Sequence, residues 1–198
     1  MRILAFSDLH RDLDAAASLV ERSGDADVVI GAGDFANQHH GLEPTIAALA
    51  AIEAPTILIP GNNETEDALR AAASAWTAAT VLHGETAEID GVTFFGLGAG
   101  IPTTPWDWSF DLTEEQAAER LAGCPRKAVL VVHSPPSGHC DSSSRGDHLG
   151  STAILAAVED KQPPLAICGH IHEAWGERSG VGPTEIANLG PAGATFEI

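Results

Sequence analysis

Short apolar segments alternate with helical patterns from the first residues, and this alternation most restricts how the chain can fold. The apolar segments that predict buried strands lie at residues 2–6, 27–31 and 56–59. Segments with helical spacing follow each of them, at residues 12–22, 44–53 and 65–75. This βαβαβα order predicts a parallel sheet covered by helices.

The second half of the chain has a different pattern. Residues 86–97 predict a hairpin whose turn is Asp90-Gly91. Two long loops, 98–111 and 134–148, are expected to frame a binding cleft. The predicted helices are 113–122 and 150–160, and the predicted strands are 127–132, 164–168, 184–188 and 194–198. These late strands indicate a second sheet rather than a simple doubly wound fold.

The length and composition fit one globular domain over residues 1–198. No apolar run approaches the ~20 residues of a membrane span, so no integral membrane protein is expected. The 28 acidic and 10 basic residues give a net charge of −18, and the only lysines are Lys127 and Lys161. Such a surface repels polyanions, so non-specific binding to duplex nucleic acid is not expected. A small phosphorylated substrate stays possible, because bound divalent cations can reverse the charge of a pocket.

Cysteine usage and the N-terminus favour the cytoplasm. Cys124, Cys140 and Cys168 are scattered and odd in number, which favours reduced thiols over a disulfide framework. The N-terminal sequence MRILAFSDLH lacks the long apolar segment of a signal peptide. The oligomeric state stays open at this stage.

Five polar clusters stand just after five of the predicted strands. Ligands in open α/β sheets bind beyond the carboxyl ends of strands, so these clusters are expected to converge. Taken singly, each could be ordinary turn or helix-cap chemistry. Their shared position after strands favours a functional site. The clusters are Asp8-Leu9-His10, Gly33-Asp34, Gly61-Asn62-Asn63-Glu64, His133 and Gly169-His170-Ile171-His172.

The side chains of these clusters share the chemistry of metal ligands. They offer carboxylate and amide oxygens and imidazole nitrogens without sulfur, which suits Mn, Fe, Zn, Co or Ni. Seven such ligands are too many for one ion with an open position, but they fit two ions that share a bridging carboxylate. We expect two divalent ions and favour Mn.

The motifs DLH, GD, GNNE, VVHSPP and GHIH resemble those of the calcineurin-like metallophosphoesterase family. The resemblance covers residues 3–172, and HLGS at 148–151 and NLGP at 188–191 are similar to its small prokaryotic branch. It implies an α/β fold in which two mixed sheets pack as a sandwich flanked by helices (α/β/β/α). It also implies a dinuclear metal centre that hydrolyses phosphate esters.

The resemblance further implies a role for each ligand. A hydroxide between the metals would attack phosphorus in line, while the cations neutralise the developing charge. The implied ligands of one metal are Asp8, His10 and His172, the implied bridge is Asp34, and the implied ligands of the other metal are Asn62, His133 and His170.

One departure from the family pattern bears on catalysis. The family usually has GNH followed by Asp or Glu, with the histidine placed to donate a proton to the leaving group, but this chain has Asn63 there. An amide cannot act as a general acid at neutral pH. We expect weaker chemistry, a bias toward good leaving groups, or a substitute acid, with His148 first and His39 and His40 next. Glu64 is expected to orient Asn63 or a ligand, or to be an ordinary residue of a helix's first turn.

These features favour a metal-dependent phosphoesterase, and a phosphodiesterase over a phosphomonoesterase because a diester needs less charge neutralisation. A scaffold or ligand-binding module on the same fold is the alternative that Asn63 permits, and a large exposed apolar patch would favour it. A metal hydrolase acting on an amide or lactone ranks last, because an HxHxDH pattern is absent.

Other conspicuous side chains are expected to be structural. We expect loop 98–111 to bury Trp106 and Trp108 itself, although the two indoles could instead line the cleft mouth. His83 and His139 belong to no motif and are expected at the surface.

Overall fold

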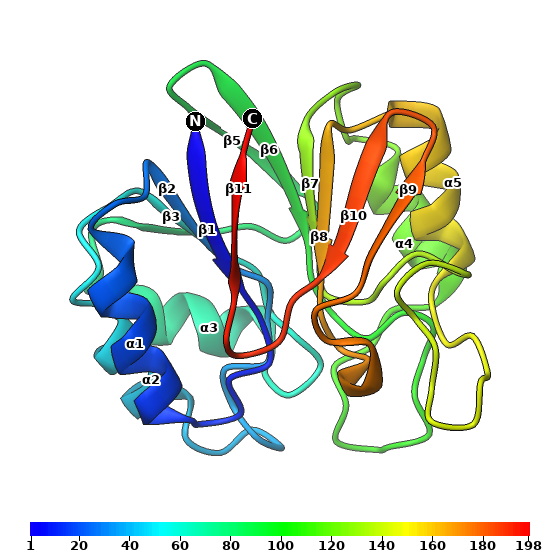
Figure 1. The fold of residues 1–198 in the computed structure, drawn as a ribbon. Coiled ribbons are helices and arrows are strands. Elements are labelled where there is room, and N and C mark those ends of the chain that lie inside the picture. The colour runs from blue at the N-terminus through cyan, green and yellow to red at the C-terminus, as the bar shows by residue number, and fades with distance from the viewer.

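Two mixed sheets form the framework of the fold (Figure 1), and the computed structural model describes all 198 residues. The first sheet has the order β11-β1-β2-β3-β4, with β11 antiparallel to β1 and the other neighbours parallel. Its strands are β1 (Arg2–Phe6), β2 (Val28–Gly31), β3 (Thr56–Leu58), β4 (Ala79–Val81) and β11 (Ala194–Glu197). The helices between them are α1 (Leu13–Ser23), α2 (Leu42–Leu49) and α3 (Glu66–Ala73).

The second sheet has the order β5-β6-β7-β8-β10-β9, and only its edge strands β5 and β9 run antiparallel to their neighbours. Its strands are β5 (Glu85–Ile89), β6 (Val92–Leu97), β7 (Val129–Val132), β8 (Leu165–Cys168), β9 (Arg178–Val181) and β10 (Thr184–Asn188). The helices of this half are α4 (Glu114–Leu121), α5 (Thr152–Lys161) and the short 3-10 helix η1 (His172–Ala174).

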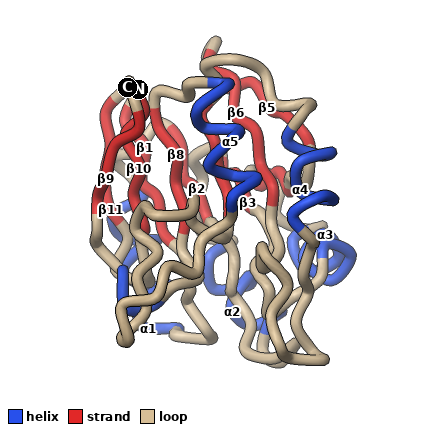
Figure 2. The backbone as a smooth tube through the Cα atoms, turned by 90° about the vertical axis from the view of Figure 1, so that its right-hand side faces the viewer, coloured by secondary structure: helices blue, strands red, loops and turns tan.

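The alternation of side chains along the strands produces the layers. In β1, Leu4 and Phe6 pack toward the helices with Leu19 of α1, while Ile3 and Ala5 point into the space between the sheets. A third apolar cluster joins the second sheet to α4 and α5. In Figure 2, α4 and α5 lie on the outer face of this sheet. The order of layers is therefore helix, sheet, sheet, helix, as the family resemblance implied.

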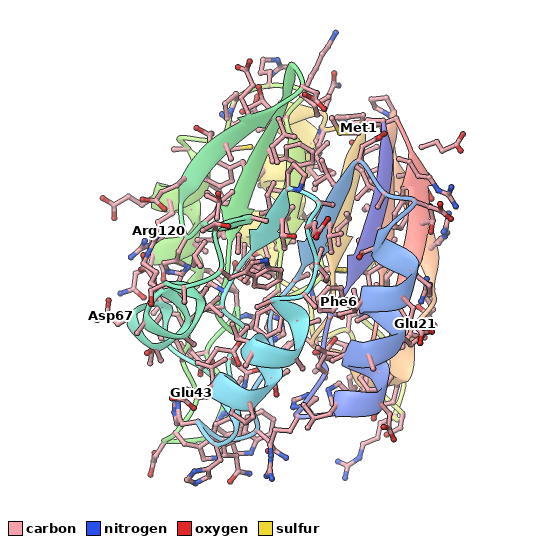
Figure 3. All side chains as sticks on the ribbon, turned by 90° about the vertical axis from the view of Figure 1, so that its left-hand side faces the viewer. Met1, Phe6, Glu21, Glu43, Asp67 and Arg120 are labelled. Atoms are coloured by element: carbon pink, nitrogen blue, oxygen red, sulfur yellow. The ribbon has the colours of Figure 1, made fainter.

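The outer helix faces are acidic. Figure 3 shows Glu21, Glu43 and Asp67 projecting from α1, α2 and α3, while Phe6 lies at the end of β1 under these helices. All three carboxylates are exposed, whereas Phe6 is buried. None of the α-helices is both long and apolar enough to cross a membrane.

Most predicted elements are present, with shifts at their ends. The hairpin turn has Asp90 and Gly91 at φ of 49° and 79°, as a tight hairpin requires. The helix predicted at 44–53 is instead α2, which begins at Leu42 and keeps Pro44 in its first turn. Strands β4 and β9 were not predicted. β4 has only three residues and β9 is a polar strand at the edge of its sheet, so neither shows a clear alternation of apolar and polar residues.

Candidate metal centre

The five polar clusters converge at one end of the sandwich. They follow the carboxyl ends of β1, β2 and β3 in the first sheet and of β7 and β8 in the second. The two sheets therefore contribute ligands to one site, as the prediction from strand ends required.

The side chains form two adjacent groups whose ligand atoms lie within 4.8 Å of one another in each group. The first group contains Asp8, His10 and His172. In it the Nε2 atoms of His10 and His172 are 3.1 Å apart, and the His172 Nε2 lies 3.8 Å from an Asp8 carboxylate oxygen.

The second group contains Asp34, His133 and His170, and Asn62 completes it. The Asn62 Oδ1 lies 3.3 Å from the Nε2 of His133 and 3.1 Å from the Nδ1 of His170. An amide oxygen between two imidazole nitrogens adds a ligand that carries no charge.

Asp34 lies between the two groups. Its Oδ2 is 3.5 Å from the Nε2 of His10, and its Oδ1 is 3.4 Å from the Nε2 of His133. Each carboxylate oxygen thus faces a different group, which is the placement that a bridging ligand needs.

The backbone orients two of the histidines. The Nδ1 of His133 is 2.8 Å from the carbonyl oxygen of Ala32, and the Nδ1 of His10 is 3.2 Å from that of Ala36. A ring whose Nδ1–H donates to a carbonyl turns its Nε2 toward the site, where that nitrogen can ligate a metal in its deprotonated form.

The buried carboxylates have only histidines as partners of opposite charge. The side chains of Asp8 and Asp34 are almost completely buried, and neither pairs with a lysine or an arginine. Burying two carboxylates side by side with so little positive charge is costly. Two divalent ions would remove that cost, so the donor set fits a dinuclear centre.

The pKa values of the site follow from burial and from the pairing of Asp34 with His133. Burial raises the pKa of Asp8. Burial also acts to raise the pKa of Asp34, but His133 lowers it below its usual value. Burial opposes a proton on His133, yet Asp34 raises the pKa of His133 to about 9. Burial and then the His133 charge lower the pKa of His170 to about 3, so His170 is a neutral donor.

Four of the candidate ligands have left-handed backbones. The φ angles of Asp8, His10, Asp34 and His170 are 54°, 44°, 59° and 69°. Non-glycine residues rarely adopt this conformation, and each such residue costs roughly 1–3 kcal/mol. The surrounding fold must hold these residues in place.

Glycines allow the strand ends to approach each other closely. A methyl group on Gly61 would overlap the Asp34 carboxylate, and one on Gly169 would overlap that of Asp8. Gly61 and Gly169 are therefore required by the packing around the Asp34 and Asp8 carboxylates.

Asn63 and Glu64 both hold Asp34 from the β3 end. The Nδ2 of Asn63 donates to the Asp34 Oδ2 at 2.7 Å, and its backbone N–H donates to the Oδ1 at 2.9 Å. The Glu64 carboxylate accepts from the backbone N–H groups of Asp34, Gly61 and Ala36 at 2.7–3.0 Å. Burial raises the pKa of Glu64 to about 7. Glu64 thus orients the bridging ligand, and it is not an ordinary residue of a helix's first turn.

The structure does not bring the expected substitute acids into the site. The Nδ1 of His148 lies 2.6 Å from Asp141, and its side chain does not line the cavity. The Nε2 of His39 contacts the carbonyl oxygen of Trp108, and His40 is exposed. None of the three histidines touches the ligand groups, so their positions do not support a role as general acid.

A cavity of about 710 Å³ opens over both ligand groups. Its lining contains His10, Asp34, Asn62, Asn63, His170 and His172, and no lysine or arginine. Residues 102–106 and Trp108 of the long loop also line it, so the expectation that this loop buries its own indoles is wrong. Loop 134–148 contributes nothing to the lining, although Leu149 beside it does, so only one of the two loops frames the cavity.

Several supporting residues were missed by sequence reasoning. Trp175 donates from its indole to Asp8 at 3.1 Å and packs against the His172 ring, and Ser7 donates to the same carboxylate. Asn188 donates to the carbonyl oxygens of Gly169 and Ile171 and fixes the GHIH turn. Trp175 lies three residues after His172, and this spacing was the one feature of the sequence that could have indicated its contact with the site.

Two relatives are similar in sequence to parts of this chain. UPF0046 protein K07C11.7 of Caenorhabditis elegans is 29% identical across 94% of this chain and 68% of its own length. UPF0046 protein T07D4.2 of the same organism is 31% identical across 50% of this chain. The chain spans only 25% of the length of that second relative.

Solved structures share the fold. TT1561 of Thermus thermophilus matches with a TM-score of 0.78 at 17% identity, covering 96% of this chain and 90% of its own. A dimetal phosphatase from Danio rerio matches at 0.64 and 13% identity, covering 97% and 88%. An archaeal phosphodiesterase matches at 0.58 and 19% identity, covering 96% and 84%.

The family model for calcineurin-like phosphoesterases matches residues 1–174. That range contains all seven candidate ligands and all strands except β9, β10 and β11. The chain therefore belongs to the calcineurin-like phosphoesterase family.

Proposed function

We propose that this chain is a dinuclear metal-dependent phosphodiesterase. The observation that carries the proposal is Asp34, whose two carboxylate oxygens face two separate groups of ligands at the floor of an open cavity. The family is dimetal-dependent, and both candidate ligand groups are built from this chain alone.

Each residue has a defined part in this proposal. Asp8, His10 and His172 would hold one ion, Asn62, His133 and His170 would hold the other, and Asp34 would be shared between them. When bound, two divalent ions would supply an activated water nucleophile and would stabilise the charge that develops on the phosphoryl oxygens. The protein orients the bridge through Asn63 and Glu64 and two of the imidazoles through backbone carbonyls.

The charge of the cavity favours a diester over a monoester. A phosphomonoester is largely a dianion at neutral pH, whereas a diester is a monoanion. Beyond the two proposed ions, no lysine or arginine lines the cavity to balance a second charge, and Glu173 adds a negative one. Asn63 stands where the family has its proton donor, and its amide cannot protonate a poor leaving group. A diester with a good leaving group is the substrate class that such a site hydrolyses best.

The proposal also includes Mn as the metal and the cytoplasm as the location of the protein. The donors are nitrogen and oxygen without sulfur, which suits Mn among several divalent ions. All three cysteines are buried free thiols, which is compatible with the reducing cytoplasm.

The test is Mn²⁺-stimulated hydrolysis of bis(p-nitrophenyl) phosphate compared with p-nitrophenyl phosphate. We expect diester turnover that exceeds monoester turnover and disappears in Asp34→Asn. Asp14→Asn, an exposed carboxylate on α1, is the matched control and should keep full activity.

Two results would overturn the proposal in different ways. Faster monoester hydrolysis would show that another residue supplies the proton and would remove the diester assignment. No turnover of either ester by protein that binds Mn²⁺ would favour a scaffold or ligand-binding module on this fold.

A further inference from the structure

Two indoles stand side by side on one wall of the cavity. Trp106 and Trp108 stack with ring centroids 5.4 Å apart and an interplanar angle of 8°, and both line the cavity above the ligand groups. Trp106 is 50% exposed, which makes it one of the few large apolar side chains left in solvent. Because the two indoles stack on each other, one face of each ring is covered. The outer face of the stack is left to contact a ligand.

The loop that carries the indoles is built onto the metal site. The side chain of Asn62 donates to the hydroxyl of Ser109 at 2.9 Å, and the Asn62 carbonyl accepts from the N–H of Phe110 at 2.9 Å. The Asp111 carboxylate accepts from the backbone and hydroxyl of Thr104 and from Ser109. A metal ligand and the loop therefore share hydrogen bonds, and the stack has a defined position relative to the reacting centre.

Two other exposed apolar side chains, Leu149 and Trp175, lie in or beside the same site. Five large hydrophobic residues are exposed, and Trp106 and Leu149 among them line this cavity. A third, Trp175, packs against the ring of His172. Exposed apolar surface concentrated at a cavity marks a ligand-binding surface.

We propose that the Trp106–Trp108 stack binds a planar aromatic group of the substrate, so that the preferred substrate is a phosphodiester with an aromatic ring on the ester arm that stays on phosphorus. This inference rests on the proposed function and names its substrate class. Aromatic rings stack on tryptophan whatever their hydrogen-bonding pattern, so a nucleobase and a simple aryl ring share the required chemistry. The phosphate lies over the two ligand groups while the ring continues the indole stack.

The absence of cations in the lining supports an uncharged ring at this position. Apart from the ligand groups and the indoles, the polar side chains of the lining are Asn37, Asn63, Thr103, Thr104 and Glu173. The amides and hydroxyls can form hydrogen bonds but do not balance a negative charge. A second phosphate or a carboxylate in the cavity would be repelled by Glu173.

The kinetic test uses diesters with one shared leaving group. Methyl, phenyl and thymidine 5′ p-nitrophenyl phosphates all release p-nitrophenolate, so they differ only in the arm that stays on phosphorus. We expect kcat/KM to be higher for the phenyl and thymidine esters than for the methyl ester by about tenfold. Trp106→Ala should remove this advantage, so that the three esters have similar kcat/KM values.

Matched variants separate stacking from general apolar contact. Trp106→Phe keeps an aromatic face and should keep most of the advantage, whereas Trp106→Leu should lose it. Leu13→Ala removes a similarly exposed apolar side chain on α1, outside the cavity, and should change nothing.

A binding measurement gives a second, non-kinetic readout. Adenosine 5′-phosphate and ribose 5-phosphate differ only in the base, so calorimetry in Mn²⁺ isolates its contribution. We expect about tenfold tighter binding of the nucleotide to the wild type, and equal binding of both to Trp106→Ala.

The outcomes distinguish this inference from the function on which it rests. Equal kcat/KM for all three diesters, unchanged in Trp106→Ala, would overturn the stacking inference and leave the phosphodiesterase standing. No hydrolysis of any ester would overturn the proposed function, while the nucleotide preference in calorimetry would still report on the stack. A preference for thymidine but not for phenyl would restrict the ring to nucleobases.

Discussion

Asn63 stands where the family resemblance implies a histidine. Its side-chain amide donates to the Asp34 carboxylate at 2.7 Å, and its Oδ1 accepts from the backbone N–H of Gln38 at 2.8 Å. Both hydrogen bonds position groups and neither can transfer a proton to a leaving group. In the proposed phosphodiesterase, position 63 therefore supplies no proton donor.

Replacing Asn63 with histidine should restore that proton donor. For Asn63→His with Mn²⁺, we expect hydrolysis of esters with poor alkyl leaving groups to rise by on the order of 10²-fold, with little change for p-nitrophenyl esters. Measuring kcat/KM against leaving-group pKa for both proteins checks this. Asn63→Gln is the control, because it changes the side-chain length without adding an acid. A uniform effect on all leaving groups would refute the assignment of the missing acid to this position.

At the scale of elements, the site depends on close approach between strand ends. Gly61 after β3 leaves no room for a side chain beside Asp34, which follows β2. The left-handed φ of Asp34 then turns its carboxylate between the two ligand groups. Backbone geometry at these two positions sets where the bridge lies.

Gly61→Ala should therefore damage the metal centre. The added methyl group displaces the Asp34 carboxylate, so we expect Mn²⁺ affinity and diester turnover each to fall by at least about 10-fold. Gly24→Ala is the matched control, since a methyl group there meets nothing within 4 Å. Calorimetry with Mn²⁺ and turnover measured on both variants test the point, and an unaffected Gly61→Ala would contradict it.

His83 links the two sheets, contrary to the expectation that it lies at the surface. It follows β4, its side chain is buried, and its Nδ1 accepts from the N–H of Gly98, which follows β6. Its Nε2 has no partner. Burial, with the charge of Arg120, lowers the pKa of His83 to about 4.

This histidine should make stability depend on pH. Because the folded pKa is below the unfolded value of about 6.5, the unfolded state binds more protons between these values. The stability from neutral His83 is therefore present above about pH 6.5 and lost as pH falls. We expect the wild type to lose about 2 kcal/mol more than His83→Gln between pH 7 and pH 5. Urea unfolding of both proteins in chelator measures this, and identical losses would refute the shift.

At the scale of the whole molecule, repulsion among negative charges opposes folding. The net charge is −18, and two of the carboxylates are buried next to each other in the candidate centre. Bound divalent ions would relieve both the local and the overall repulsion. Metal binding and folding are thus expected to be coupled.

Removal of metal should lower the melting temperature. At a Mn²⁺ concentration of 100 times its dissociation constant, we expect about 2.7 kcal/mol of added stability from one site. Thermal unfolding with Mn²⁺ and with chelator checks this, and Asp34→Asn should show little difference between the two conditions. Added NaCl should stabilise the chelated protein more than the Mn²⁺-loaded one, because it screens the same repulsion.

Local pattern in the sequence determined the elements and the donor set. The period of apolar residues predicted the strands and helices that carry the ligands, and the family motifs implied the two-sheet sandwich. The position of polar clusters after strands predicted that Asp8, Asp34, Asn62, His133 and His170 meet. These features follow from spacing along the chain, so a sequence displays them directly.

Only the tertiary structure decided what surrounds the donors. It turned Trp106 and Trp108 into the cavity, paired His148 with Asp141 away from the ligands, and buried His83 between the sheets. Each of these outcomes depends on the path of a loop or on contacts between residues far apart in sequence. No local period encodes such contacts, because burial and partners are fixed only when the layers pack together.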